Sequence, residues 1–166
     1  ESINSETISK SITEANVHNG KYTVEQFGVL GTIGDIFVDN LNHLYLADTG
    51  NNRIVCLDDK YNLRLILNNF INENGVPDAL SKPQGVFVTE SEIYVADTGK
   101  SRIVIFDKMG NFQCIVSEPD SEVIPDKSVY TPIAVSVDKA GRIYVVSSTT
   151  NYGVVSMNRD SSFNGF

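Results

Sequence analysis

The side chains best placed for chemistry are an aspartate and an arginine that occur together twice. Asp48 is followed by the turn Thr49–Asn52 and by Arg53, and Asp97 precedes Arg102 at the same spacing. Glycine and asparagine tolerate a positive φ, an aspartate can accept hydrogen bonds from turn amides, and an arginine can bind a carboxylate. Because a catalytic residue is rarely duplicated from repeat to repeat, we interpret both pairs as a structural motif that closes a chain reversal.

Few residues in the chain suit other catalytic chemistries. The chain has two histidines, His18 in a polar stretch and His43 beside an expected turn. Neither position suggests the base of a nucleophilic triad, and zinc sites usually need several clustered His or Cys residues. Cys56 and Cys114 lack CxxC spacing and align with apolar residues of the other repeat copy, which predicts buried free thiols. No carboxylate pair suited to glycoside hydrolysis and no glycine-rich phosphate loop is recognisable. We therefore predict no catalytic residue, no metal ligand and no cofactor.

These residues belong to an internal repeat. Residues 45–50 recur as 94–99, and residues 53–58 recur as 102–107 at the same offset. A third, weaker copy keeps Pro132 and Tyr144 but lacks the aspartate and the arginine. A repeat of this length that forms four strands implies a β-propeller.

Each copy is predicted to form four short strands. In the second copy they are 85–88, 92–96, 102–106 and 112–116, rich in Val, Ile, Tyr and Phe and bounded by turn residues. No segment has a helical apolar period of useful length. The stretches 68–81 and 117–130 are predicted to be polar connectors, and such long connectors can project from one face and carry binding.

The pattern resembles the NHL repeat, which runs Pro-x-Gly, an apolar strand, Tyr-Val-Ala-Asp-Thr, a Gly/Asn turn and Arg-Ile. The second copy carries Pro83, Gly85, the run 94–99 and Arg102, whereas the first has Ile33 and Asp35 where proline and glycine are expected. The resemblance implies an all-β fold, a β-propeller of four-stranded antiparallel NHL-type blades, of which about three are present. A weaker similarity is to NHL-repeat proteins that Gram-positive bacteria export or anchor outside the membrane.

The organisation expected from this resemblance is a flexible polar lead, 1–20, and a partial propeller, 21–166. The three blades are expected at 31–70, 81–118 and 130–166. NHL propellers usually close with about six blades, so three would leave two apolar blade faces uncovered. Either further blades or a second copy of the chain must then close the ring, and an end inside a strand favours a fragment.

Composition limits the function. The formal net charge of −8 argues against a nucleic-acid partner, including the RNA-binding mode of some NHL domains. No apolar run approaches the roughly 20 residues of a membrane helix. We expect a non-catalytic scaffold that binds a protein, peptide or glycan, outside the cytoplasm by family likeness.

The alternative is a calcium-dependent sugar-lactone or ester hydrolase of the six-bladed propeller type. Oxygen ligands suffice for calcium, and ligands in that group come from loops at one end of the inner strands. The candidate ligand-binding residues are the polar side chains at the three inner-strand entrances: Asp35, Gln84 and Thr131.

Overall fold

A computed structural model describes residues 28–119, 130–149 and 153–165. The predicted polar lead lies outside these residues, as does His18. Residues 120–129 of the second predicted connector lie outside them too. The described residues form twelve strands in three four-stranded antiparallel sheets, and two further strands pair as a hairpin.

Each four-stranded sheet is one blade, and its strands follow chain order from the inside outwards. Blade 1 consists of β1 (Ile33–Val38), β2 (Leu44–Asp48), β3 (Arg53–Leu57) and β4 (Leu63–Leu67). Blade 2 consists of β7 (Gly85–Val88), β8 (Glu92–Asp97), β9 (Arg102–Asp107) and β10 (Phe112–Val116). Blade 3 consists of β11 (Pro132–Val137), β12 (Ile143–Ser147), β13 (Val154–Met157) and β14 (Phe163–Gly165). Short 3₁₀ turns, η1 (Thr49–Asn51) and η2 (Thr98–Lys100), join the second and third strands of blades 1 and 2.

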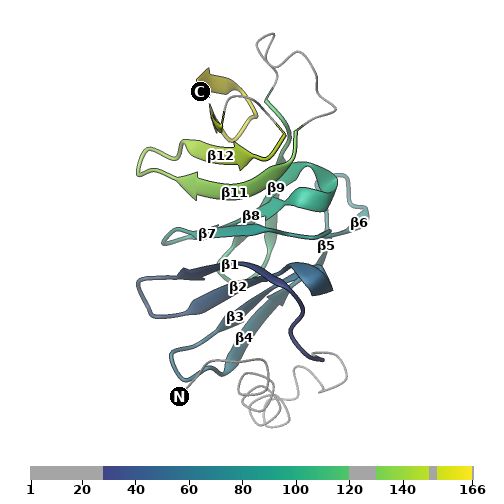
Figure 1. Ribbon diagram of the computed structural model, residues 1–166, viewed down its shortest axis with the longest axis vertical. Coiled ribbons are helices and arrows are strands. Elements are labelled where there is room, and N and C mark those ends of the chain that lie inside the picture. The colour runs from purple at the N-terminus through teal and green to yellow at the C-terminus, as the bar shows by residue number, and fades with distance from the viewer. Residues whose placement is uncertain (1–27, 120–129, 150–152, 166) are drawn as a thin grey trace.

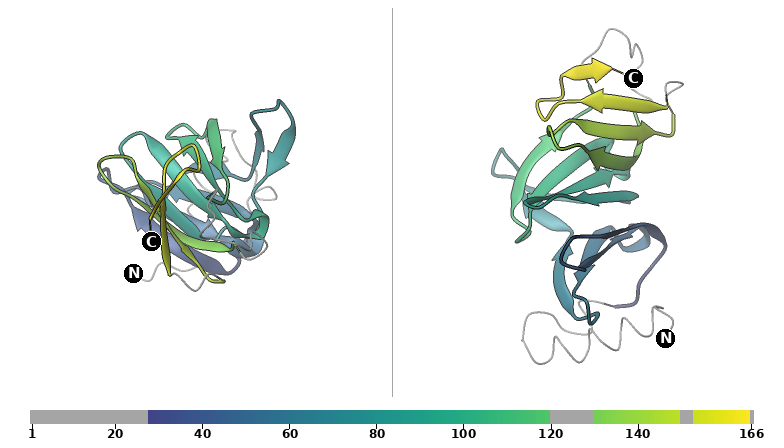
Figure 2. Two further views of the ribbon diagram at one scale, coloured as in Figure 1. Left: turned by 90° about the horizontal axis from the view of Figure 1, so that it is seen from above. Right: turned by 90° about the vertical axis from the view of Figure 1, so that its left-hand side faces the viewer.

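The blades stack face to face in chain order. Figure 1 shows blade 1 at the bottom, blade 2 in the middle and blade 3 at the top, with β1, β7 and β11 running side by side. Figure 2 shows the same sheets fanning around an axis. This arrangement confirms the predicted fold class, an all-β partial propeller.

Strand alternation gives each blade two apolar faces, because successive side chains point to opposite sides of a sheet. On blade 1, Tyr45 and Ile54 face blade 2 and belong to one buried cluster with Val95 and Phe106. The opposite face of blade 2 forms a second cluster with blade 3. Blade 2 is therefore covered on both sides, and burial between blades is the main source of stability.

The first predicted connector is not a simple loop. Within 68–81 the chain forms a hairpin, β5 (Asn69–Ile71) paired with β6 (Pro77–Ala79). The prediction missed it because two three-residue strands are too short for an alternating pattern. The prediction of two buried thiols is also partly wrong. Cys56 is buried between the blades, but Cys114 on β10 is only partly buried.

Close approach of the inner strands explains two glycines. A Cβ on Gly85 would come within 3.0 Å of the Ala134 Cα and the Ile133 carbonyl oxygen of blade 3. In blade 1 the corresponding approach falls at Gly34, where a Cβ would lie 2.6 Å from Thr49 Oγ1 and 3.1 Å from Gln84 Cα. The sequence aligns Gly85 with Asp35. In blade 1 the glycine at the close approach is Gly34, one position earlier.

Candidate functional site

The aspartate of the repeated motif anchors the chain just before each inner strand. Asp48 Oδ1 accepts the Gly31 amide at 2.9 Å, and Oδ2 accepts Arg53 Nε at 2.7 Å. In blade 2, Asp97 makes the same two bonds, to the Ser81 amide at 2.6 Å and to Arg102 Nε at 2.8 Å. Burial raises the pKa of Asp97, and the Ser81 amide and Arg102 oppose that effect.

Blade 3 has a similar uncharged anchor, which binds the amide one residue nearer to the proline. Ser147 stands at the end of β12, and its Oγ accepts the Thr131 amide at 2.9 Å. The strand register places Gly153 where blade 2 has Arg102. The shared element is thus an acceptor for one backbone amide, and the arginine accompanies only a carboxylate.

The threonine after each aspartate links one blade to the next. Thr49 Oγ1 donates to the Pro83 carbonyl of blade 2 at 2.6 Å, and Thr98 Oγ1 donates to the Pro132 carbonyl of blade 3 at 2.7 Å. Sequence reasoning overlooked this role. Its signal was present, because a threonine follows the aspartate in both copies and a proline lies at or just before the start of both following inner strands.

The three predicted ligand-binding residues lie at or near the starts of the three inner strands, and each makes different contacts. Asp35 accepts two backbone amides, Ile36 at 2.8 Å and Val86 of blade 2 at 3.0 Å, so it bridges two inner strands. Gln84 donates its backbone amide to Ala96, and Thr131 Oγ1 accepts a hydrogen bond from Thr149. Within the part of the chain that the structure describes, no three His, Cys, Asp or Glu side chains group closely enough to hold a metal ion.

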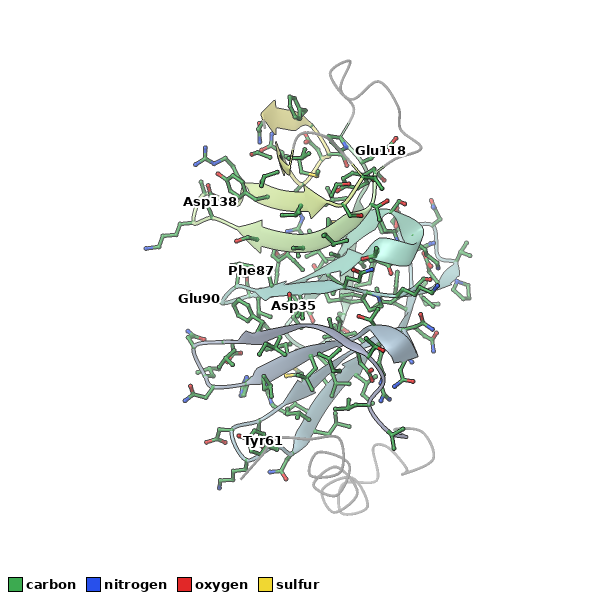
Figure 3. The ribbon with its side chains drawn as sticks, viewed as in Figure 1. Asp35, Tyr61, Phe87, Glu90, Glu118 and Asp138 are labelled. Carbon is green, nitrogen blue, oxygen red and sulfur yellow. The ribbon has the colours of Figure 1, made fainter. Side chains whose placement is uncertain are left out.

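A pocket lies at the opposite end of the inner strands, and we call it the turn-end pocket. Its volume is about 700 Å³, and the turns β1–β2, β7–β8 and β11–β12 surround it. Figure 3 shows Phe87, Glu90 and Asp138 gathered towards this edge of the molecule. Its lining combines apolar and acidic side chains: Phe37, Val38, Asp39, Phe87, Val88, Glu90, Glu92, Tyr94, Val137 and Asp138, beside Asn40, Thr89, Ser91, Lys139 and Gly141.

Aromatic and apolar side chains lie between the turns. The rings of Phe37 and Phe87 meet edge to face with centroids 5.0 Å apart. Among the acids, Glu90 is exposed, whereas Asp39 is buried in its turn. A pocket with an apolar lining and a few convergent polar groups is the usual form of a small-ligand site.

Ion pairs between blades hold the acidic side of this pocket in place. Lys108 of blade 2 donates to Asp39 of blade 1 at 2.8 Å and lies over the Tyr45 ring at 5.4 Å. Asp39 also lies 3.0 Å from His43 Nδ1. One blade further on, Arg159 of blade 3 binds Glu92 of blade 2 at 2.7 Å.

The hairpin β5–β6 lies at the outer side of blade 2 and is firmly anchored. Asp78 accepts Arg102 Nη1 at 2.7 Å and Lys100 Nζ at 2.6 Å. Arg102, and then Lys100, hold the pKa of Asp78 far below its usual range against the opposing effect of burial. The Phe70 ring stacks on Phe112 at 5.1 Å. Arg102 therefore joins the repeated motif to the hairpin, which no repeat pattern could predict.

Comparisons with solved structures support the fold. The chain is similar to hydrazine synthase from Kuenenia stuttgartiensis, with TM-score 0.61, 10% identity, and coverage of 82% of this chain and 35% of that one. It is also similar to a catalytically inactive virginiamycin B lyase from Staphylococcus aureus with quinupristin, with TM-score 0.54, 10% identity, and coverage of 87% and 43%. A third similar structure is the extracellular domain of a hybrid two-component system from B. thetaiotaomicron, with TM-score 0.54, 16% identity, and coverage of 81% and 18%.

The chain therefore spans less than half the length of each of these structures. No family model matches it, and no curated protein does. At these identities the likeness concerns the fold alone. In the residues that the structure describes, no helix is both long enough and apolar enough to cross a membrane.

Proposed function

We propose that this chain is a non-catalytic NHL-type propeller module that binds a ligand, with the turn-end pocket as its binding site. The observation that carries the proposal is the pocket itself. It lies where the inner-strand turns of all three blades meet, and its volume is in the usual range for a small-ligand site. The two interblade ion pairs fix its walls before any ligand arrives, which lowers the entropic cost of binding.

The lining indicates the ligand class. Phe37, Phe87 and Val137 offer apolar surface, and the exposed Glu90 offers negative charge at the rim. Asp138 at the same rim is paired with Arg142, and Lys139 is the one cation among the lining residues. A cationic group on an apolar stem fits this combination, because the apolar part leaves water while the charge meets carboxylates. A lysine-bearing peptide is one carrier of such a group.

The NHL assignment and a location outside the cytoplasm belong to the same proposal. The NHL assignment is supported by the repeated Asp-Thr-Gly run, each of whose polar side chains makes the same contact in blades 1 and 2. The location is supported by the similarity to an extracellular domain. For the calcium-dependent hydrolase we find no favouring observation.

The test compares three six-carbon probes that differ in charge: hexylammonium, 1-hexanol and hexanoate. Backbone amide spectra of the labelled chain should shift at Thr89–Glu92 and Asp138–Gly141 with hexylammonium, less with hexanol and not with hexanoate. Glu90→Gln should weaken hexylammonium binding several-fold. Glu73→Gln, which removes an equal charge from the exposed hairpin tip, should leave binding unchanged. Equal binding of hexanoate, or equal effects of both substitutions, would contradict the proposal.

A further inference from the structure

The contacts between blades repeat, and among the residues that the structure describes blade 3 has no blade packed against its second face. At the first junction, Lys108 in the β9–β10 turn of blade 2 reaches back to Asp39 of blade 1. At the second, Arg159 in the β13–β14 turn of blade 3 reaches back to Glu92 of blade 2. Each of these blades thus places a cation from its outer turn on an acid beside the inner turn of the preceding blade. Asp39 starts that turn in blade 1, and Glu92 follows it as the first residue of β8 in blade 2.

The acid that would receive the next cation is Asp138 on blade 3. Its Oδ2 accepts Arg142 Nε of its own turn at 2.7 Å, as Asp39 Oδ2 contacts His43 of its own turn in addition to Lys108. Asp138 begins the β11–β12 turn with the bonds that Asp39 makes in blade 1: its Oδ1 accepts two turn amides, Ala140 and Arg142 at 2.9 and 3.0 Å. The side chain of Asp39, covered by Lys108, is 3% exposed, whereas that of Asp138 is 28% exposed.

The face of blade 3 turned away from blade 2 also matches the covered faces. This free face, defined by Tyr144, Val146, Val154 and Ser156, has the register of the faces that blades 1 and 2 turn to their successors. Ile54 and Ile103 are at most 1% exposed on those faces, but Val154, in the same register position, is 42% exposed. Tyr144 repeats the positions of the buried Tyr45 and Tyr94 and is itself only partly buried.

We propose that the free face of blade 3 docks a further four-stranded blade that carries a lysine or arginine as the second residue of its outer turn, to bind Asp138. The occupant is a blade because the free face has the same strand register as the two faces that blades cover. Like those faces, it lies beside an acid that a cation of the next blade could bind. The chain also covers only 35% and 43% of two propeller structures that it resembles, which leaves room for such blades.

A second copy of this chain does not meet this requirement. The outer turns of the three blades begin with the same backbone bonds at Asp58, Asp107 and Asn158. The next residue is Lys108 in blade 2 and Arg159 in blade 3, but Asp59 in blade 1. Blade 1 of a second copy would therefore bring Asp59 towards Asp138, and two like charges at an interface disfavour it.

The substitution Asp59→Lys tests this directly, because it supplies the missing cation on an exposed turn of the full chain. Sedimentation equilibrium at low salt should find weak self-association for the unmodified chain and association at least about tenfold tighter for Asp59→Lys. Adding Asp138→Asn to Asp59→Lys should return self-association to the weak level of the unmodified chain. Asparagine keeps an acceptor for the turn amides. A tight dimer of the unmodified chain that Asp138→Asn does not weaken would overturn the proposal in favour of a second copy.

A fused blade provides a second measurement that does not depend on blade 1. Residues 68–119, which include blade 2 and its connector, are appended after Phe166, with either lysine or glutamate at the appended counterpart of Lys108. Amide hydrogen exchange in β12 and β13 should slow at least about tenfold more with lysine than with glutamate. Equal protection by the two versions would show that Asp138 does not select the docking blade, and the proposal would fail.

Discussion

Blades 1 and 3 each use the side chain at the end of their second strand to accept a hydrogen bond from a backbone amide just before the inner strand. The accepting side chain differs between the two blades. Blade 1 uses the carboxylate of Asp48, which is fully buried and paired with Arg53. Blade 3 uses the hydroxyl of Ser147, which is also buried but neutral, and has Gly153 near the arginine position. Because a buried charge without a partner is costly whereas a hydroxyl needs only a hydrogen bond, the aspartate and the arginine must be gained or lost together.

Of the substitutions considered, Arg53→Met is expected to lower the free energy of unfolding most. Arg53 Nε lies 2.7 Å from Asp48 Oδ2, and both side chains are almost completely buried. Removing the cation leaves a buried carboxylate uncompensated, so we expect the free energy of unfolding to fall by about 3–5 kcal/mol. Urea unfolding followed by circular dichroism measures the change.

The matched control is Arg142→Met, which breaks the exposed Arg142–Asp138 pair of blade 3. Exposed pairs contribute little, so this variant should lose no more than about 1 kcal/mol. Equal losses in the two variants would mean that burial does not distinguish the two pairs.

The stability of the fold should depend on pH through Asp39, the acid that Lys108 of the neighbouring blade covers. Burial raises the pKa of Asp39, but bonds from Lys108 and from the His43 and Leu41 amides outweigh it and lower the pKa from 3.8 to about 2. An acid with a lowered folded pKa stabilises the fold above its unfolded pKa, and this contribution is lost as the pH falls towards the folded pKa. We expect a loss of roughly 2 kcal/mol between about pH 5 and pH 2 from this group.

Lys108→Met tests the cause of that loss. The variant should be less stable than the unmodified chain at pH 5, and the two free energies of unfolding should converge towards pH 2. A constant difference across this range would mean that the Lys108–Asp39 pair does not set the pKa of Asp39.

A double substitution can give blade 1 the uncharged anchor of blade 3. The double substitution Asp48→Ser with Arg53→Met removes the buried charge together with its partner and leaves a hydroxyl for the Gly31 amide. We expect it to be about 1–2 kcal/mol more stable than Arg53→Met alone. Calorimetric melting of both variants measures the difference, and additive losses would show that Asp48 and Arg53 are not coupled.

Sequence periodicity was sufficient for the fold but not for the contacts between blades. The four strands of the second copy follow from its alternating pattern, and the observed β8 and β9 extend one residue further, to Asp97 and Asp107. Strand position in a repeat is a local property, and the turn residues that bound it are visible in the chain.

Interblade chemistry could not be predicted in the same way, because it joins residues far apart in sequence. The pairing of Lys108 with Asp39 spans 69 positions, and in blade 2 the acid moves from the start of the inner turn to Glu92 at its end. The turn-end pocket arises only when three turns converge, so no single motif indicated it. Asp35, predicted as a possible ligand-binding residue, also bridges β1 to β7, a contact that its polarity alone could not reveal.

Ser147→Ala gives the smallest effect and isolates the part of the motif that all three blades share. The substitution removes one hydroxyl, and the Thr131 amide loses its partner at 2.9 Å. We expect the free energy of unfolding to fall by about 1 kcal/mol, against less than about 0.5 kcal/mol for Ser136→Ala on the exposed side of β11. Hydrogen exchange at Thr131 should accelerate in the first variant only. If Ser147→Ala changed neither stability nor exchange, an acceptor at this strand end would not be required, and in blades 1 and 2 the aspartate would serve its arginine rather than the backbone.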